Sequence, residues 1–163
     1  MIHPIEFAAL AAQYKSELLD RVMPFWMEHS IDHERGGFFT CIERDGEVYD
    51  TDKFIWLQGR EVWMLATLYN KVDAREEWLN AAIQGAEFLL KYGHDGQFNW
   101  YFSLDREGHP LIEPYNIFSY TFAVIAFGQL YKATGNPRYA EVAKKTFDIV
   151  LEKRHCPKGR WSK

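Results

Sequence analysis

The chain has 163 residues, with 19 lysines and arginines against 23 aspartates and glutamates, which gives a formal net charge of −4 with neutral histidines. Apolar residues make up 47% and charged residues 26%, so the composition excludes a disordered chain and indicates one folded domain at most. No apolar run approaches the roughly 20 residues that cross a bilayer, and no basic leader precedes an apolar stretch. We therefore expect a cytoplasmic protein without membrane or nucleic-acid partners.

A long helix and a small hairpin are predicted first along the chain. The helix covers about residues 5–28, and Pro24 is expected to bend its last turns because proline has no N–H to donate. Residues 37–42 and 47–49 then alternate in polarity around an Asp-Gly turn signal, which predicts two antiparallel strands.

Two kinds of helix follow. Residues 54–71 and 117–133 are apolar nearly all round, which predicts helices buried on most sides. Residues 76–92 and 138–154 are amphipathic, so each is expected to pack one stripe against its neighbours. The dipeptide Asn136-Pro137 gives the last helix an N-cap and a proline in its first turn.

The same order of elements occurs more than once. His33, His94 and His155 are each 61 residues apart, and each is followed within six residues by glycine and an aromatic residue. Residues 44–46 (Arg-Asp-Gly) match residues 106–108 (Arg-Glu-Gly) at an offset of 62. The sequence therefore contains a repeat of about 61 residues.

Alternation of a buried inner helix with an amphipathic outer helix predicts an all-α fold, the α/α toroid or barrel, with small β-hairpins between the helix pairs. A closed ring of six such pairs needs about 366 residues, whereas residues 1–163 hold roughly two and a half repeats. An open arc exposes its inner helices at the broken edge. We therefore expect the N-terminal part of one larger barrel domain, or a chain that pairs with a partner.

Arg60 breaks the repeat. The residue 62 positions further on is Phe122, so an arginine stands where packing alone would place an apolar side chain. Trp56 and Trp63 share its helical face, and an arginine buried between them needs a charged or polar partner. One interpretation is a buried salt bridge, for example with Glu61, or stacking on tryptophan. The other is a clamp for an anion or a carbonyl oxygen in the mouth of the barrel.

The last twenty residues carry seven basic side chains against two acidic ones. Lys158, Gly159, Arg160 and Lys163 could bind phosphate groups, although a solvated charged tail explains the same composition. No metal site is expected: His29 and His33 have helical spacing, but the glycines that follow end the helix.

Several motifs resemble the opening of the N-acylglucosamine 2-epimerase family. The resemblance implies an α/α barrel of six helix pairs that interconverts N-acetyl-D-glucosamine and N-acetyl-D-mannosamine, by removing and returning the C2 proton of the open-chain sugar. The segments that carry the resemblance are residues 25–30 (FWMEHS), 36–41 (GGFFTC), 46–50 (GEVYD), 56–60 (WLQGR), 62–64 (VWM), 85–90 (GAEFLL) and 133–135 (ATG) with Arg138 and Tyr139.

The family resemblance also assigns roles to residues. Arg60 matches the active-site arginine, which holds O1 or O2 of the sugar, and Trp56 and Tyr120 are expected to line the cavity. The family's catalytic histidines lie in the second half of its barrel, and no histidine of this chain matches them, so we expect this chain alone to be inactive.

The resemblance further implies ATP as an activator that is not consumed, and a homodimer. The nucleotide-contacting residues would be Lys158, Gly159, Arg160 and Lys163. Other aldose-ketose isomerases, a cellobiose-type 2-epimerase, or a non-catalytic half barrel that binds a partner remain alternatives.

Overall fold

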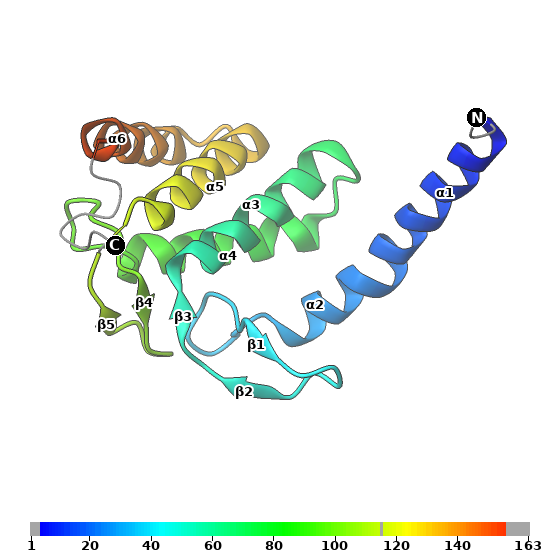
Figure 1. Ribbon diagram of the computed structural model, residues 1–163, viewed down its shortest axis with the longest axis horizontal. Helices are drawn as coiled ribbons and strands as arrows, with labels where there is room; N and C mark the ends of the chain where they lie inside the picture. Colours follow the sequence, from blue (N-terminus) through cyan, green and yellow to red (C-terminus); the bar gives the residue numbers. More distant parts are fainter. Residues whose placement is uncertain (1–3, 115, 156–163) are drawn as a thin grey trace.

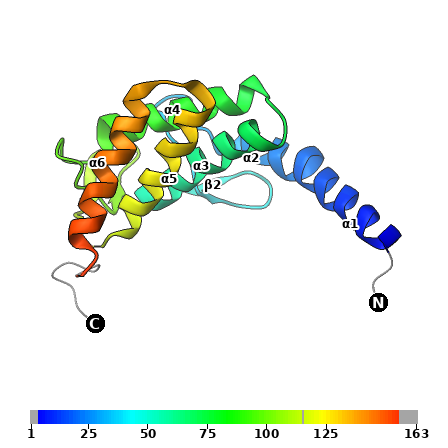
Figure 2. The same cartoon turned by 90° about the horizontal axis from the view of Figure 1, so that it is seen from above.

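The computed structural model describes residues 4–114 and 116–155. Four helices of equal length form two antiparallel pairs, and a long N-terminal helix projects away from them (Figures 1 and 2). Among the described residues, no helix is long and apolar enough to cross a membrane. In chain order the elements are α1 (Pro4–Ser16), the π-helix η1 (Glu17–Val22), α2 (Met23–His29), β1 (Cys41–Ile42), β2 (Val48–Asp50), β3 (Lys53–Phe54), α3 (Ile55–Lys71), α4 (Glu76–Tyr92), β4 (Ser103–Leu104), β5 (Pro110–Ile112), α5 (Phe118–Thr134) and α6 (Pro137–Lys153).

The leading helix is interrupted where the sequence places proline. A π-helical segment, Glu17–Val22, separates α1 from α2, and Pro24 stands in the first turn of α2. The ring of Pro24 would clash with the carbonyl four residues earlier in a regular helix, and a π-helical turn moves that carbonyl away. The predicted irregularity is confirmed, although it precedes the proline.

Inner helices α3 and α5 pack closely against each other because small residues line their contact. A Cβ atom on Gly59 would lie 3.1 Å from the carbonyl carbon of Phe122. Near the other end, Asn70 donates its amide N–H to the carbonyl of Gln129 at 3.0 Å. Helices α4 and α6 cover the outer side of this pair, as the alternation of buried and amphipathic helices predicted.

Two small sheets link the helix pairs. Strands β1 and β2 form the predicted hairpin, but β1 begins at Cys41 rather than at residue 37, because residues 30–39 form a loop closed by the Ile31–Phe38 bridge. Strand β3 pairs with β4, and β4 pairs with β5. The segment that leads into α3 is therefore bound to the hairpin of the following repeat, a pairing that the sequence pattern did not predict.

The repeat is real, but its histidines are not structurally equivalent. In the loop after α2 the N–H of Asp32 donates to the carbonyl of Gly37, and in the loop after α4 the N–H of Asp95 donates in a similar way to the carbonyl of Asn99. Asp32 therefore corresponds to Asp95. His33 follows Asp32 directly, whereas His94 directly precedes Asp95. From the hairpins onward the offset is 62, as predicted.

The edges of this arc expose apolar side chains. On α5, Phe118 and Ile125 are 58% and 40% exposed, and on α1 Phe7 and Tyr14 are 61% and 70% exposed. The prediction that an open arc leaves its inner helices partly uncovered is confirmed for α5.

Candidate functional site

The first two turns of α3 present two opposite faces. Gln58 is fully buried: its side-chain oxygen accepts the N–H of Phe38 at 2.8 Å, and its side-chain N–H donates to the carbonyl of Phe38 at 2.8 Å. Arg60 lies two residues further, about 200° round the helix axis. Its guanidinium therefore points to the opposite face, where it is exposed.

Aromatic rings border Arg60 on this face. The half-buried ring of Trp56 packs on the ring of Phe122 from α5, with 5.8 Å between centroids. Phe118, one turn earlier on α5, is exposed. Aromatic surfaces with a few fixed polar groups are typical of small-molecule sites, so the face formed by Trp56, Arg60, Phe118 and Phe122 is the candidate site. We call it the inner face.

Arg60 differs from the expectation that it is buried between tryptophans. Its side chain is exposed, and no hydrogen bond or ion pair joins it to any residue of the described ranges. The alternative of a buried salt bridge with Glu61 is therefore wrong. Glu61 is half-buried, and this burial raises the pKa of its carboxyl while the charge of Arg60 opposes the shift. A guanidinium that pairs with none of the described side chains can bind an oxygen-rich ligand.

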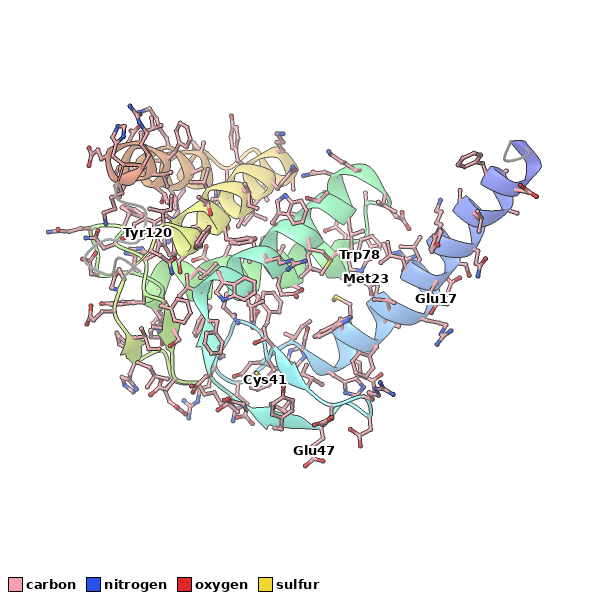
Figure 3. All side chains as sticks on the ribbon, in the orientation of Figure 1. Glu17, Met23, Cys41, Glu47, Trp78 and Tyr120 are labelled. Atoms are coloured by element: carbon pink, nitrogen blue, oxygen red, sulfur yellow. The ribbon has the colours of Figure 1, made fainter. Side chains whose placement is uncertain are left out.

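Tyr120 lies on a different side of α5. It is 1% exposed, its hydroxyl accepts from the Lys153 ammonium of α6 at 2.8 Å, and that ammonium lies 4.5 Å from the ring centroid. Figure 3 shows Tyr120 at the start of α5, next to α6. The offset of 62 pairs Tyr120 with Gln58, which also turns away from the inner face. The structure does not bring Tyr120 together with Arg60, and we assign it no contact with substrate.

Other predicted sites are not formed by the described residues. Lys158, Gly159, Arg160 and Lys163 lie outside the described residues, so nucleotide binding stays a prediction. Within residues 4–114 and 116–155, no group of three or more histidine, cysteine, aspartate or glutamate side chains could hold a metal ion.

Sequence reasoning missed a buried charged cluster of Asp32, Lys53 and Arg106. The Lys53 ammonium and the Asp32 carboxylate are completely buried and 2.9 Å apart. One signal in the sequence points to it: the position 62 residues after Lys53 is Tyr115, so a lysine replaces an aromatic residue just before an inner helix.

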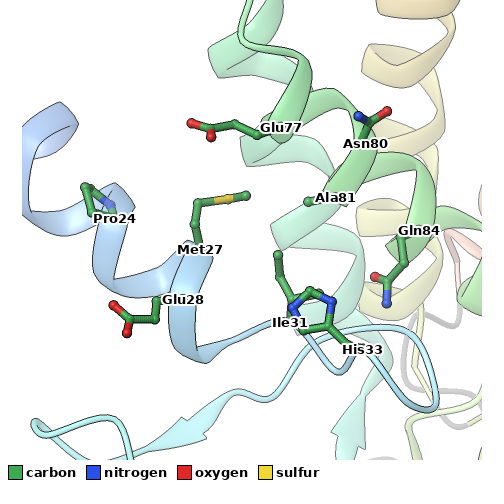
Figure 4. A pocket seen from close by; sticks show the side chains of 9 residues that line it. All are labelled: Pro24, Met27, Glu28, Ile31, His33, Glu77, Asn80, Ala81 and Gln84. Carbon is green, nitrogen blue, oxygen red and sulfur yellow. The ribbon is translucent and has the colours of Figure 1, made fainter.

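A pocket on the outer side lies between α2 and α4 (Figure 4). Met27, Ile31 and Ala81 form its apolar part, and Glu28 and Glu77 flank it. It contains none of the residues predicted for the sugar or the nucleotide.

The pairing of inner with outer helices defines the chain as a segment of an α/α barrel. The exposed arginine beside aromatic rings marks its candidate ligand face. A sequence profile of the N-acylglucosamine 2-epimerase family matches residues 37–161, and the chain belongs to this family. Arg60, which the family motif predicted as a site residue, lies on the inner face, and its role stays a prediction.

Individual relatives agree with this assignment. N-acylglucosamine 2-epimerase from Bos taurus is 46% identical over 146 residues, which cover 86% of this chain and 35% of the relative. Cellobiose 2-epimerase from Bacteroides fragilis is 30% identical over 143 residues, which cover 86% of this chain and 36% of the relative. The chain thus spans about a third of the length of the curated relatives it matches.

The solved structure of cellobiose 2-epimerase from Spirochaeta thermophila superposes with a TM-score of 0.83 at 22% identity. The match covers 92% of this chain and 37% of that structure, and it establishes the α/α-barrel fold.

Proposed function

We propose that the protein carrying this chain is a sugar 2-epimerase that interconverts N-acetyl-D-glucosamine and N-acetyl-D-mannosamine. The observation that carries the proposal is the exposed guanidinium of Arg60, which pairs with none of the described residues and lies on an aromatic-bordered inner face. The choice of sugar follows the relatives, because N-acylglucosamine 2-epimerases are 45–47% identical to this chain and the Bacteroides fragilis cellobiose 2-epimerase is 30% identical.

Epimerisation at C2 requires removal of a proton next to the aldehyde of the open-chain sugar. Negative charge then develops on O1, the aldehyde oxygen, as the enolate forms, because C2 of these sugars carries the acetamido nitrogen. Return of the proton to the other face of C2 completes the reaction. A guanidinium that donates hydrogen bonds to O1 stabilises that charge. This is the role we assign to Arg60; we assign the proton transfers to no residue of this chain.

Deuterium exchange at C2 tests the proposed reaction. The natural protein that carries this sequence is incubated with N-acetylmannosamine in heavy water, and the sugars are followed by proton NMR. We expect the C2 proton signal to disappear as labelled N-acetylglucosamine forms. Conversion without label at C2 would contradict the proposed chemistry. Cellobiose in a parallel sample tests the cellobiose-type alternative, which the Bacteroides fragilis relative favours.

ATP is proposed as an activator that binds the basic C-terminal segment. Replacing both Lys158 and Arg160 by alanine removes two cations, and we expect the ratio of epimerisation rates with and without ATP to fall to about one, because each cation supplies charge-assisted hydrogen bonds to phosphate. The rate ratio of the unchanged protein is the reference. An undiminished ATP response in the double variant would assign the segment to a solvated tail.

Two further expectations of the family resemblance stay predictions, a homodimer and a cytoplasmic location. Light scattering after gel filtration of the natural protein tests the first. Cell fractionation tests the second.

A further inference from the structure

Lys53 is a buried lysine that uses all of its hydrogen-bonding capacity. Its ammonium donates to Asp32 Oδ2 at 2.9 Å, to the carbonyl of Gly36 at 2.6 Å and to the carbonyl of Arg106 at 3.1 Å. It also lies 4.5 Å from the centroid of the Phe88 ring. A buried ammonium is tolerated only with such complete pairing.

Asp32 is equally saturated, and it joins two cations. Arg106 binds it with two parallel bonds, from Nε to Oδ2 at 3.0 Å and from Nη2 to Oδ1 at 3.1 Å. Oδ1 also accepts the backbone N–H groups of Glu34 and Arg35. Burial alone would raise the pKa of Asp32, but the bonds from Arg106 and Lys53 outweigh it and hold the pKa well below its usual range. The carboxylate is thus charged at every physiological pH.

The three residues come from three separate segments. Asp32 lies in the loop after α2, Lys53 in β3, and Arg106 in the turn between β4 and β5. Strand β3 runs directly into α3, whose first residue, Ile55, donates its N–H to the carbonyl of Phe102. The cluster therefore fixes the point at which α3 begins, and Arg60 stands in the second turn of that helix.

The second repeat has no lysine at the position of Lys53. Asp95, the structural equivalent of Asp32, is exposed and accepts the backbone N–H groups of Gln97 and Asn99, but forms no ion pair with the residues described in the structure. The residue that corresponds to Lys53 is Tyr115. The same repeat also has Phe122 in place of Arg60. An aspartate that closes the loop is therefore common to both repeats, whereas a lysine just before the inner helix accompanies only the helix that carries the arginine.

We propose that Asp32, Lys53 and Arg106 are positioning residues whose buried cluster fixes the start of α3 and thereby the place of Arg60 on the inner face. The link from Arg60 to catalysis rests on the proposed function. The link from the cluster to the start of α3 does not.

Hydrogen exchange of backbone amides in the natural protein tests the structural half. Lys53→Met keeps the length of the side chain and removes its charge, and Arg106→Gln is a milder second variant because Arg106 is partly exposed. We expect exchange of the amides in residues 55–60 to become at least about tenfold faster in either variant, with the amides of α6 unchanged. Arg44→Gln is the matched control, because Arg44 is the repeat counterpart of Arg106 and is exposed. It should leave residues 55–60 unchanged.

The proposal is overturned if either variant folds and its amides in residues 55–60 exchange at the unchanged rate. It is also overturned if all amides of Arg106→Gln exchange faster to the same extent.

The catalytic half is tested by the rate of C2 proton exchange in Arg106→Gln. We expect kcat to fall at least about tenfold and KM to change less than about threefold, because a displaced Arg60 loses contact with the developing charge. Faster amide exchange with an unchanged kcat would overturn the catalytic half. Absence of C2 exchange in the unchanged protein refutes the proposed function and leaves the amide result standing.

Discussion

Replacing Arg60 by methionine is expected to lower kcat for C2 proton exchange by about 10²–10³-fold while the protein remains folded. Removal of one donor that stabilises a developing oxyanion has an effect of that size. The fold should tolerate the change because the Arg60 side chain is exposed and forms no bond with the described residues. The measurements are the initial rate of deuterium incorporation and the midpoint of thermal unfolding.

Two further variants make this prediction specific to the guanidinium. Arg60→Lys keeps the charge but loses the planar pair of donors, so we expect it to restore only a small part of the rate. Lys71→Met removes an exposed cation from the last turn of the same helix and should leave the rate unchanged. A variant Arg60→Met that unfolds, or that retains its full rate, would contradict the role assigned to Arg60.

Much of the fold could be predicted because the bounds of the helices follow from local sequence patterns. The amphipathic stripe of α4 predicted its bounds to the residue, and Asn136 caps α6 with a bond from the Arg138 N–H to its side chain. Repetition then supplied the layered arrangement. The strand pairing of β3 with β4 joins positions about fifty residues apart and carries no comparable local pattern, so it could not be read from periodicity.

The candidate site was predictable only in part, for a physical reason. Arg60 stood out because the repeat offers Phe122 as its counterpart, yet its exposure depends on which helices cover the inner face. Tyr120 was expected to line the cavity because of the family resemblance, which does not give the direction of a side chain. In the structure it is buried beside α6, and the offset of 62 pairs it with the buried Gln58. The same comparison, applied to Lys53 and Tyr115, singles out Lys53 as a member of the buried cluster, but it does not give the partners Asp32 and Arg106.

Replacing Asp32 by asparagine is expected to lower the free energy of unfolding by about 3–5 kcal/mol near neutral pH, the loss that follows when one partner of a buried ion pair is removed. Asparagine can still accept the backbone N–H groups of Glu34 and Arg35, so the loop stays closed. What is lost is the charge that compensates Lys53 and Arg106. Urea denaturation of the natural protein, followed by tryptophan fluorescence, gives the difference between the two proteins.

The pH dependence of this difference in the free energy of unfolding shows whether the effect of Asp32 comes from its charge or from its shape. The pKa of Asp32 is lower in the folded protein than the value of about 3.9 in an unfolded chain, so its stabilisation is complete above about pH 5 and is lost as the pH falls towards the folded-state pKa. The difference in the free energy of unfolding between the unchanged protein and Asp32→Asn should therefore become smaller as the pH falls from about 5 to about 2.

Asp95→Asn is the matched control. Asp95 is exposed and forms no ion pair with the described residues, so we expect a loss below about 1 kcal/mol. A gap for Asp32→Asn that is as small as this control would show that the buried cations do not depend on the carboxylate.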